Sequence, residues 1–191
     1  MNCANCEKMD CYEGKDCVGI ARAVVDRYLS SEDDSHTARV ASSVEARFYG
    51  KLTRLGELIR FAREMSYRHL GIAFCIGLSQ EAKTLQAVLE REGFTVSSVC
   101  CKVCGIMKER LQFEKIDEEN PEAMCNPLGQ AEILNRDKVN LNIICGLCIG
   151  HDILFSAHSR APVTTFIVKD RVLAHNPAGA IYSRYHLKKW L

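Results

Sequence analysis

From His69 onward, short apolar runs alternate with helical stretches, and this alternation constrains the fold more than any other feature of the chain. Strands are expected at residues 69–75, 94–101, 141–145 and 163–168. Helices are expected between them, at residues 80–92, from Asn126-Pro127 to about residue 135, and near His151. Strands alternating with helices are typical of a parallel sheet with right-handed crossovers. The sequence therefore predicts an α/β fold, with a mainly parallel sheet flanked by helices and a small N-terminal cysteine-rich metal module.

The residues before His69 divide into a cysteine-rich start and a helical region. Apolar side chains recur at three- and four-residue spacing at Val18, Ala21, Val25 and Leu29, and again at Leu52, Leu55, Leu58, Ile59 and Ala62. This spacing predicts helices that pack into the core, and Asp34 and Ser35 are expected to cap a middle helix that runs towards Phe48. We predict a metal-binding module at 1–17 and a single α/β domain at 18–191, helical over 18–68 and β/α over 69–191.

Cysteine is the outlying residue in the composition, with eleven copies. The start of the chain lacks the apolar run of a signal peptide, and no stretch approaches the roughly 20 apolar residues that span a membrane. We therefore expect a cytoplasmic protein with no membrane partner, in which the cysteines are reduced thiols. The formal charge is +1 and no Lys/Arg stripe is visible. We therefore expect no basic surface that would bind nucleic acid.

The first four cysteines are Cys3, Cys6, Cys11 and Cys17, and they lie close together in a polar segment. A short flexible loop brings four thiolates around one ion or one cluster at low entropic cost. The spacing fits neither the usual zinc pattern nor the usual ferredoxin pattern in full, so zinc and an iron–sulfur cluster both stay open. Zinc would fix the start of the chain to the domain, whereas a cluster would suggest electron transfer with a redox partner.

The other seven cysteines fall where the expected strands end or a helix begins. They are Cys75, Cys100, Cys101, Cys104, Cys125, Cys145 and Cys148. The carboxyl ends of parallel strands meet along one edge of the sheet, where ligands bind, and the start of a helix stabilises a thiolate. We therefore expect a shared thiolate site at this edge, with buried and inert cysteines as the alternative.

Polar residues accompany these cysteines at the same expected edge. His151 could serve as a ligand or a proton donor, and Asp152 could orient it or simply place a charge at a helix start. Together with Asn176, which follows the fourth expected strand, they are candidate substrate-binding residues. The segment 169–171 is interpreted as a solvated charged turn, with contact to an anionic substrate as the alternative.

Several segments resemble the signature of a known family. They are Gly71–Leu78, Cys101-Lys102, Cys125-Asn126-Pro127 with Gln130–Asn135, Gly146–Asp152 and Lys169–Pro177. The family is catalogued as domain of unknown function eighteen forty-seven, and its members are labelled predicted metal-binding proteins. The resemblance covers nearly the whole chain and implies metal binding, with Cys75, Cys101, Cys125 and Cys148 in the core pattern. The family's distribution, largely in anaerobic bacteria and archaea, favours iron–sulfur over zinc.

We therefore expect a cysteine-ligated metal-binding protein with an iron–sulfur cluster or zinc at its cysteine groups. An open metal position at the sheet edge would polarise a small-molecule substrate. One alternative is a thiol-dependent enzyme in which Cys101 or Cys148 is activated by a helix start and His151; another is a metal carrier or sensor. The roles of Cys100, Cys104 and Cys145 remain open. The sequence also lacks the phosphate-binding, dinucleotide and nucleophile-elbow motifs, which sets those familiar chemistries aside.

Overall fold

The computed structural model describes residues 1–188 and residue 190. Its contacts divide the chain into two compact units, residues 1–51 and residues 52–191. The predicted boundary between a metal module and the α/β domain after Cys17 stays a prediction. Within the described part of the chain, no helix is both long enough and apolar enough to cross a membrane.

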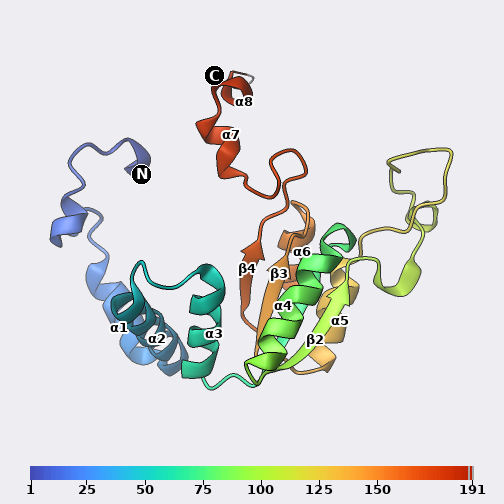
Figure 1. The fold of residues 1–191 in the computed structure, drawn as a ribbon. Helices are drawn as coiled ribbons and strands as arrows, with labels where there is room; N and C mark the ends of the chain where they lie inside the picture. The colour runs from blue at the N-terminus through green and yellow to red at the C-terminus, as the bar shows by residue number, and fades with distance from the viewer. Residues whose placement is uncertain (189, 191) are drawn as a thin grey trace. The chain divides into compact units, whose positions relative to one another are not determined.

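The second unit is built on a four-stranded sheet in which every pairing is parallel (Figure 1). Its strands are β1 (His69–Phe74), β2 (Thr95–Cys100), β3 (Leu141–Cys145) and β4 (Val163–Ile167), in the spatial order β2-β1-β3-β4. The predicted α/β fold with a parallel sheet is therefore confirmed. Because the chain continues from β1 towards β2 but resumes at β3 on the other side, the strand order reverses between β1 and β3. Ligands of open α/β sheets bind at such a switch point.

Helices cover both faces of this sheet. Helix α4 (Ser79–Arg91) connects β1 to β2 and lies on one face, whereas α5 (Pro127–Arg136) and α6 (His151–His158) pack together on the other (Figure 1). Helix α3 (Arg54–Glu64) precedes the sheet, and its Arg54 donates to the Thr164 hydroxyl of β4 at 3.0 Å. Two short helices that we did not predict, α7 (Ala178–Tyr182) and α8 (Arg184–Leu187), follow the sheet.

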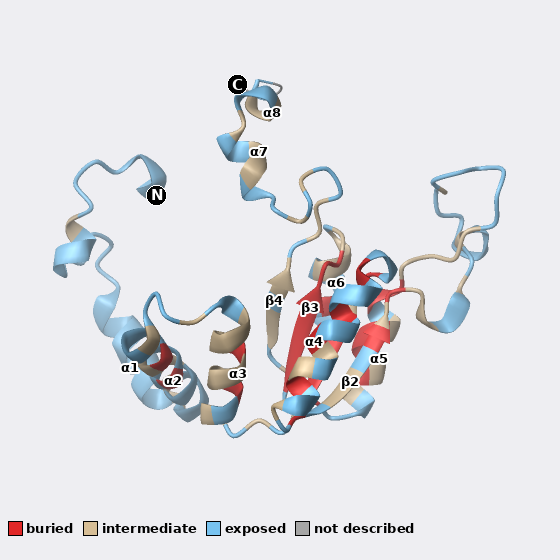
Figure 2. Cartoon of the chain, viewed as in Figure 1, coloured by how far each residue is buried: buried red, intermediate tan, exposed pale blue. Residues whose placement is uncertain are grey.

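The core lies in and around the two central strands, which are covered on both faces (Figure 2). Leu70, Ile72 and Ile143 are fully buried, as expected for central strands of a parallel sheet. The side chain of Gln130 is also fully buried, and its amide donates to the carbonyl oxygens of Phe74 and Val99. This polar side chain therefore ties the ends of β1 and β2 together beneath the candidate site.

The first unit contains α1 (Ala21–Ser30) and α2 (Glu32–Phe48), and two expectations about it are wrong. Ser31, rather than Asp34 or Ser35, caps α2, because its hydroxyl accepts a hydrogen bond from the Asp34 amide at 3.2 Å. Helix α1 forms, but none of its residues is buried, and Leu29 is 79% exposed. The apolar spacing correctly predicts the helix. So small a unit, however, has too few neighbouring side chains to cover the apolar face of this helix.

Replacing Gly146 by alanine should destabilise the second unit. Gly146 has a φ of +72°, and a Cβ there would lie 2.0 Å from Cδ1 of Leu78. We expect the free energy of unfolding to fall by roughly 3 kcal/mol from backbone strain and overpacking together. The matched control is Gly93→Ala, where φ is +90° but a Cβ meets open space, so a loss of about 1 kcal/mol is expected. Equal losses in urea unfolding of the metal-free protein would show that the Leu78 contact does not matter.

Candidate thiol and metal site at the sheet edge

Backbone hydrogen bonds continue past the strand ends and hold two cysteines at the switch-point edge. The amide of Cys75, just after β1, donates to the carbonyl oxygen of Cys145 at 3.2 Å. The amide of Cys101, just after β2, donates to the carbonyl oxygen of Phe74 at 2.8 Å. Both residues are therefore fixed by the same ladders that build the sheet, and both are buried.

The buried side chain of Asn126 brings a third cysteine to this edge. Its carboxamide oxygen accepts from the Gly129 amide at 2.8 Å and caps α5, while its amide group donates to the carbonyl oxygen of Val103 at 3.2 Å. The backbone amide of Asn126 donates to the carbonyl oxygen of Cys101 at 2.7 Å. These bonds hold the preceding residue, Cys125, beside Cys101.

Cys148 is the fourth cysteine, and it is held by the start of α6. Its carbonyl oxygen accepts hydrogen bonds from the amides of His151 and Asp152, at 2.9 and 3.1 Å. The guanidinium of Arg171, which follows β4, donates to its Sγ at 3.0 Å. This hydrogen bond raises the pKa of the Arg171 guanidinium.

The thiols of Cys101 and Cys125 form a hydrogen-bonded pair. Because Cys101 donates to Cys125, and because Lys102 and His151 lie near the acceptor sulfur, the pKa of Cys125 is lowered to about 5. The same bond, together with burial, raises the pKa of Cys101 well above its ordinary value, although its sulfur also accepts from the Ile76 amide at 3.3 Å. The interaction therefore favours a thiolate at Cys125 and a protonated thiol at Cys101.

The three remaining cysteines of the second unit have other surroundings. Burial raises the pKa of Cys145 to about 11, so this residue is a protonated core side chain. Cys100 is half-buried, and its sulfur accepts from the Lys102 amide at 3.5 Å. Cys104 is exposed on a left-handed backbone. None of the three lines the cavity, whereas Cys75, Cys125 and Cys148 do.

A cavity of about 710 Å³ opens beside the four gathered cysteines. Its cysteines and potentially cationic side chains from the sheet edge and helix starts are Cys75, Cys125, Cys148, Lys102, His151, Lys169 and Arg171. The sequence predicts a solvated charged turn at residues 169–171. In the structure, Lys169 and Arg171 from this segment line the cavity. The signal that could have found them is their position directly after a parallel strand, which is the same signal that pointed to the cysteines.

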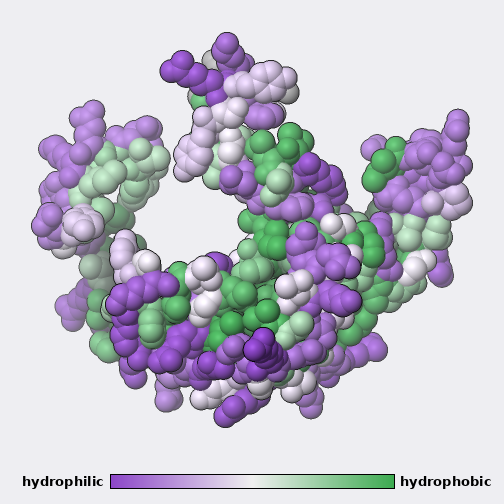
Figure 3. All heavy atoms as spheres, in the orientation of Figure 1, coloured by the Kyte–Doolittle hydropathy of each residue, from purple (hydrophilic) through white to green (hydrophobic). Residues whose placement is uncertain are grey.

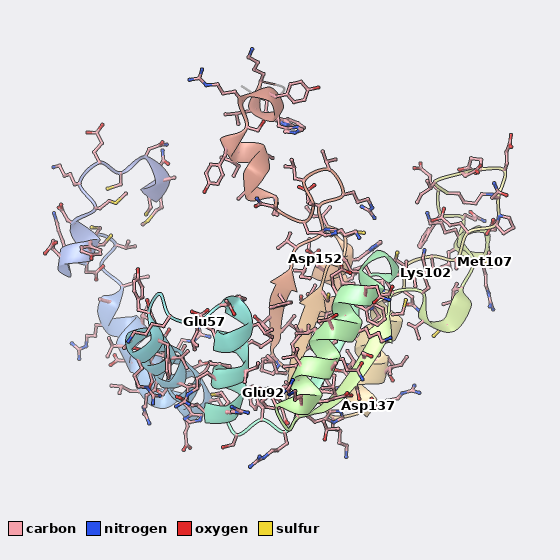
Figure 4. All side chains as sticks on the ribbon, in the orientation of Figure 1. Glu57, Glu92, Lys102, Met107, Asp137 and Asp152 are labelled. Atoms are coloured by element: carbon pink, nitrogen blue, oxygen red, sulfur yellow. The ribbon has the colours of Figure 1, made fainter. Side chains whose placement is uncertain are left out.

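The segment between β2 and α5, residues 101–126, forms the other wall of the cavity. An antiparallel bridge joins Met107 to Ala123 across its neck, and the Lys108–Glu122 ion pair, at 2.9 Å, reinforces it. Figure 4 shows Met107 on this segment, which extends beyond Lys102. Leu111, Phe113 and Ile116 from this segment line the cavity, and sequence reasoning missed this apolar contribution.

Two of the predicted substrate-binding residues lie outside the cavity. Asp152 lies at the site edge of the sheet, opposite to Glu92 and Asp137 (Figure 4), and its carboxylate accepts from the Ile153 amide at 2.8 Å within its own helix. Asn176 is exposed in the loop after β4. Neither is part of the cavity lining, whereas His151 is.

The N-terminal cysteines Cys3, Cys6, Cys11 and Cys17 are all exposed. Desolvation and the nearby charges of Cys11, Asp10 and Cys6 raise the pKa of Cys17, so these groups lie within electrostatic range of one another. The Asp16 carboxylate accepts from the amides of Val18, Gly19 and Ala21 and orders the turn into α1. These bonds hold the pKa of Asp16 below its ordinary value.

A single metal ion requires several donor side chains that converge on one point. Across residues 1–188 and 190, no three His, Cys, Asp or Glu side chains converge closely enough to hold a single ion. A tetrahedral zinc needs all its sulfurs about 2.3 Å from one point, so the sheet-edge thiols do not form a preformed zinc site. A cluster spreads its thiolates over several iron atoms, and four cysteines from four separate segments have the donor chemistry for it.

The low pKa of Cys125 predicts an unusual pH dependence of alkylation. In reduced, metal-free protein, its modification by iodoacetamide should stay nearly constant from pH 8 to pH 6 and fall only below about pH 5, because the thiolate persists above its lowered pKa. Cys145 should stay unmodified. The Cys101→Ala variant removes the donor and should slow modification of Cys125 at pH 6 several-fold. Peptide mass spectrometry resolves the sites, and a rate of Cys125 that falls steadily from pH 8 would contradict this assignment.

Comparison with known proteins places the chain in a family without assigning a reaction. Residues 13–166 match the family described as protein of unknown function, DUF1847. An uncharacterised protein of Methanocaldococcus jannaschii, MJ0455, is 56% identical over 192 residues, covering 100% of this chain and 98% of the relative. No solved structure matches the chain significantly. The family match covers most of the chain, and the relative aligns along its whole length, including the cysteine-rich start. The chain therefore belongs to the DUF1847 family.

Proposed function

We propose that this chain is a cysteine-ligated metal-binding protein whose sheet-edge thiols, Cys75, Cys101, Cys125 and Cys148, hold an iron–sulfur cluster. The observation that carries the proposal is the gathering of four thiols from four separate segments at the switch point of a parallel sheet. Buried structural cysteines are normally scattered small apolar residues, and nothing about core packing calls for four of them at a ligand-binding edge.

The charges around the four thiols support the same proposal. Arg171 donates to the sulfur of Cys148, and the positive charge of Lys102 lies near Cys125. Gathering thiolates in a partly buried site is costly unless opposite charges accompany them. These two cations would stabilise the ligands, and donors to cysteine sulfur also tune a cluster's potential. When bound, such a cluster would supply electron transfer, or, with only three of the four thiolates bound to it, Lewis-acid chemistry at the iron left without a cysteine ligand.

We infer a second metal centre at Cys3, Cys6, Cys11 and Cys17. All four are exposed on short turns, so drawing them around a metal would bury no apolar group and break few contacts. Either zinc or a cluster suits four thiolates at this spacing. This centre lies in the first unit, and its loading should be independent of the sheet-edge thiols.

Single substitutions at the sheet edge should remove bound iron. We expect Cys75→Ala and Cys148→Ala, purified without oxygen, to lose at least half of the iron and sulfide of the wild type, because a cluster missing one thiolate is released readily. Cys104→Ala is the matched control, since Cys104 is exposed and does not line the cavity. Full retention of iron in both site variants, with unchanged thermal unfolding, would rule out the cluster at this site.

The second candidate function is a thiol-dependent enzyme, and the Cys101–Cys125 pair favours it with Cys125 as the nucleophile in place of the predicted Cys101 or Cys148, because the pKa of Cys101 is raised. Cys125 lines the cavity, accepts a hydrogen bond from the thiol of Cys101, and has Lys102 and His151 nearby. A nucleophile with these partners can attack an electrophilic carbon or sulfur of a small substrate.

The two candidates differ in how alkylation affects metal content. If Cys125 is a nucleophile, one equivalent of iodoacetamide should modify it in protein as purified, with no loss of iron or zinc. If it is a cluster ligand, it should be protected until the metal is removed with a chelator. The Cys101→Ala variant serves as a further test. It should slow alkylation of Cys125, measured by peptide mass spectrometry, in the first case, and lower the metal content, measured by metal analysis, in the second.

A further inference from the structure

The cavity has room for a ligand beside the thiols. Its volume, about 710 Å³, lies within the range of small-molecule sites, roughly 300–1,000 Å³. It is bounded on one side by the sheet edge with its cysteines and on another by the segment 101–126. A site that only held four thiolates would need no such space. The residues that line the cavity should therefore indicate which further ligand it binds.

Two of the cations that line the cavity have unused hydrogen-bonding capacity. In the part of the chain that the structure describes, Nζ of Lys169 has no hydrogen-bond or ion-pair partner. Arg171 uses one N–H on Cys148, and a guanidinium carries five donors. By contrast, the ammonium of Lys108 is paired with Glu122, and that of Lys102 donates to the carbonyl oxygen of Ala123.

The opposite part of the lining is apolar and uncovered. Leu111, Phe113 and Ile116 project from the segment 101–126, and their exposed fractions are 47, 52 and 90%. Leu128 at the start of α5 and Leu154 on α6 also line the cavity and are 47 and 44% exposed. In Figure 3 the protruding part of the segment 101–126, at the right of the view, is mostly hydrophilic and carries some hydrophobic residues. Exposed apolar groups that line a concave surface favour a ligand with an apolar body.

We propose that the cavity binds a small organic anion, with its acidic head on Lys169 and Arg171 and its apolar body against Leu111 and Phe113. Glu114 also lines the cavity, on the apolar wall, where its carboxylate would disfavour an anionic head and so set the orientation of the ligand. This proposal names the class of ligand that the site described above would bind. It rests on the proposed function only because both involve the same cavity. Inorganic anions, which lack the apolar body, should bind poorly.

Isothermal titration calorimetry on the protein purified without oxygen, with its metal content measured, tests this inference. The probes are phenylacetate, 4-phenylbutyrate and phenyl phosphate, compared with acetate, inorganic phosphate and neutral phenylacetamide. We expect at least one of the three aromatic anions to bind at least tenfold more tightly than phenylacetamide and than its own inorganic or short counterpart. Comparing phenylacetate with phenyl phosphate distinguishes a carboxylate ligand from a phosphate ligand.

Variants assign the two ends of the ligand. Lys169→Met should weaken the aromatic anion at least tenfold and leave phenylacetamide unchanged, whereas Lys83→Met, an exposed lysine of α4 outside the cavity, should change neither. Phe113→Ala should weaken the aromatic anion, with Ile153→Ala as the exposed control on α6. Unchanged thermal unfolding and iron content would show that each variant folds and loads like the wild type.

The outcomes separate this inference from the proposed function. Binding of no aromatic anion to metal-loaded protein, or equal binding of phenylacetamide, would overturn the inference and leave the metal proposal standing. Binding that depends on Lys169 in a protein that holds no metal at the sheet edge would support the inference and overturn the cluster.

Discussion

Parallel alignment of β1 with β2 and with β3 is the constraint on which the site depends. Because these strands run in one direction, the residues that follow them emerge at one edge, and the backbone bonds from Cys75 to Cys145 and from Cys101 to Phe74 extend that alignment into the loops. Gln130 and Asn126 then use buried amides to tie the start of α5 to the same edge. An unsatisfied buried amide is costly, so these bonds specify where Cys125 lies. The chemistry of the site thus follows from sheet topology together with two polar side chains.

Charge explains why this arrangement of sulfurs is tolerable within a folded domain. The thiol of Cys101 and the cation Lys102 act on the sulfur of Cys125 and favour its thiolate, while the guanidinium of Arg171 donates a hydrogen bond to the sulfur of Cys148. At Cys145 burial outweighs the nearby charge of Lys169, and this thiol keeps its proton instead. Lys169 lies at the same edge, and among the described residues it donates no hydrogen bond to a cysteine sulfur. A site with more cations than its thiolates use is suited to accept an additional anion, and this connects the proposed metal site with the proposed ligand class.

The fold was largely predictable because apolar runs and helix starts are local signals. The strands begin and end within one residue of their predicted limits, and Asn126-Pro127 opens α5 as expected. The sequence also pointed to Cys75, Cys101, Cys125 and Cys148 at one edge, since strand ends of a parallel sheet converge. It could not predict the hydrogen bond between Cys101 and Cys125, or the return of the segment 101–126 to form a wall, because both depend on contacts between distant residues. The exposure of α1 was missed for the same reason.

The central claim is that the sheet-edge thiols, independently of the N-terminal cysteines, hold an iron–sulfur cluster. It is tested most directly by electron paramagnetic resonance of a variant in which Cys3, Cys6, Cys11 and Cys17 are all serine, purified without oxygen and reduced with dithionite. Our account predicts a brown protein with the spectrum of a reduced cluster and several iron atoms for each chain. A folded, colourless variant that contains no iron and shows no such spectrum would contradict it.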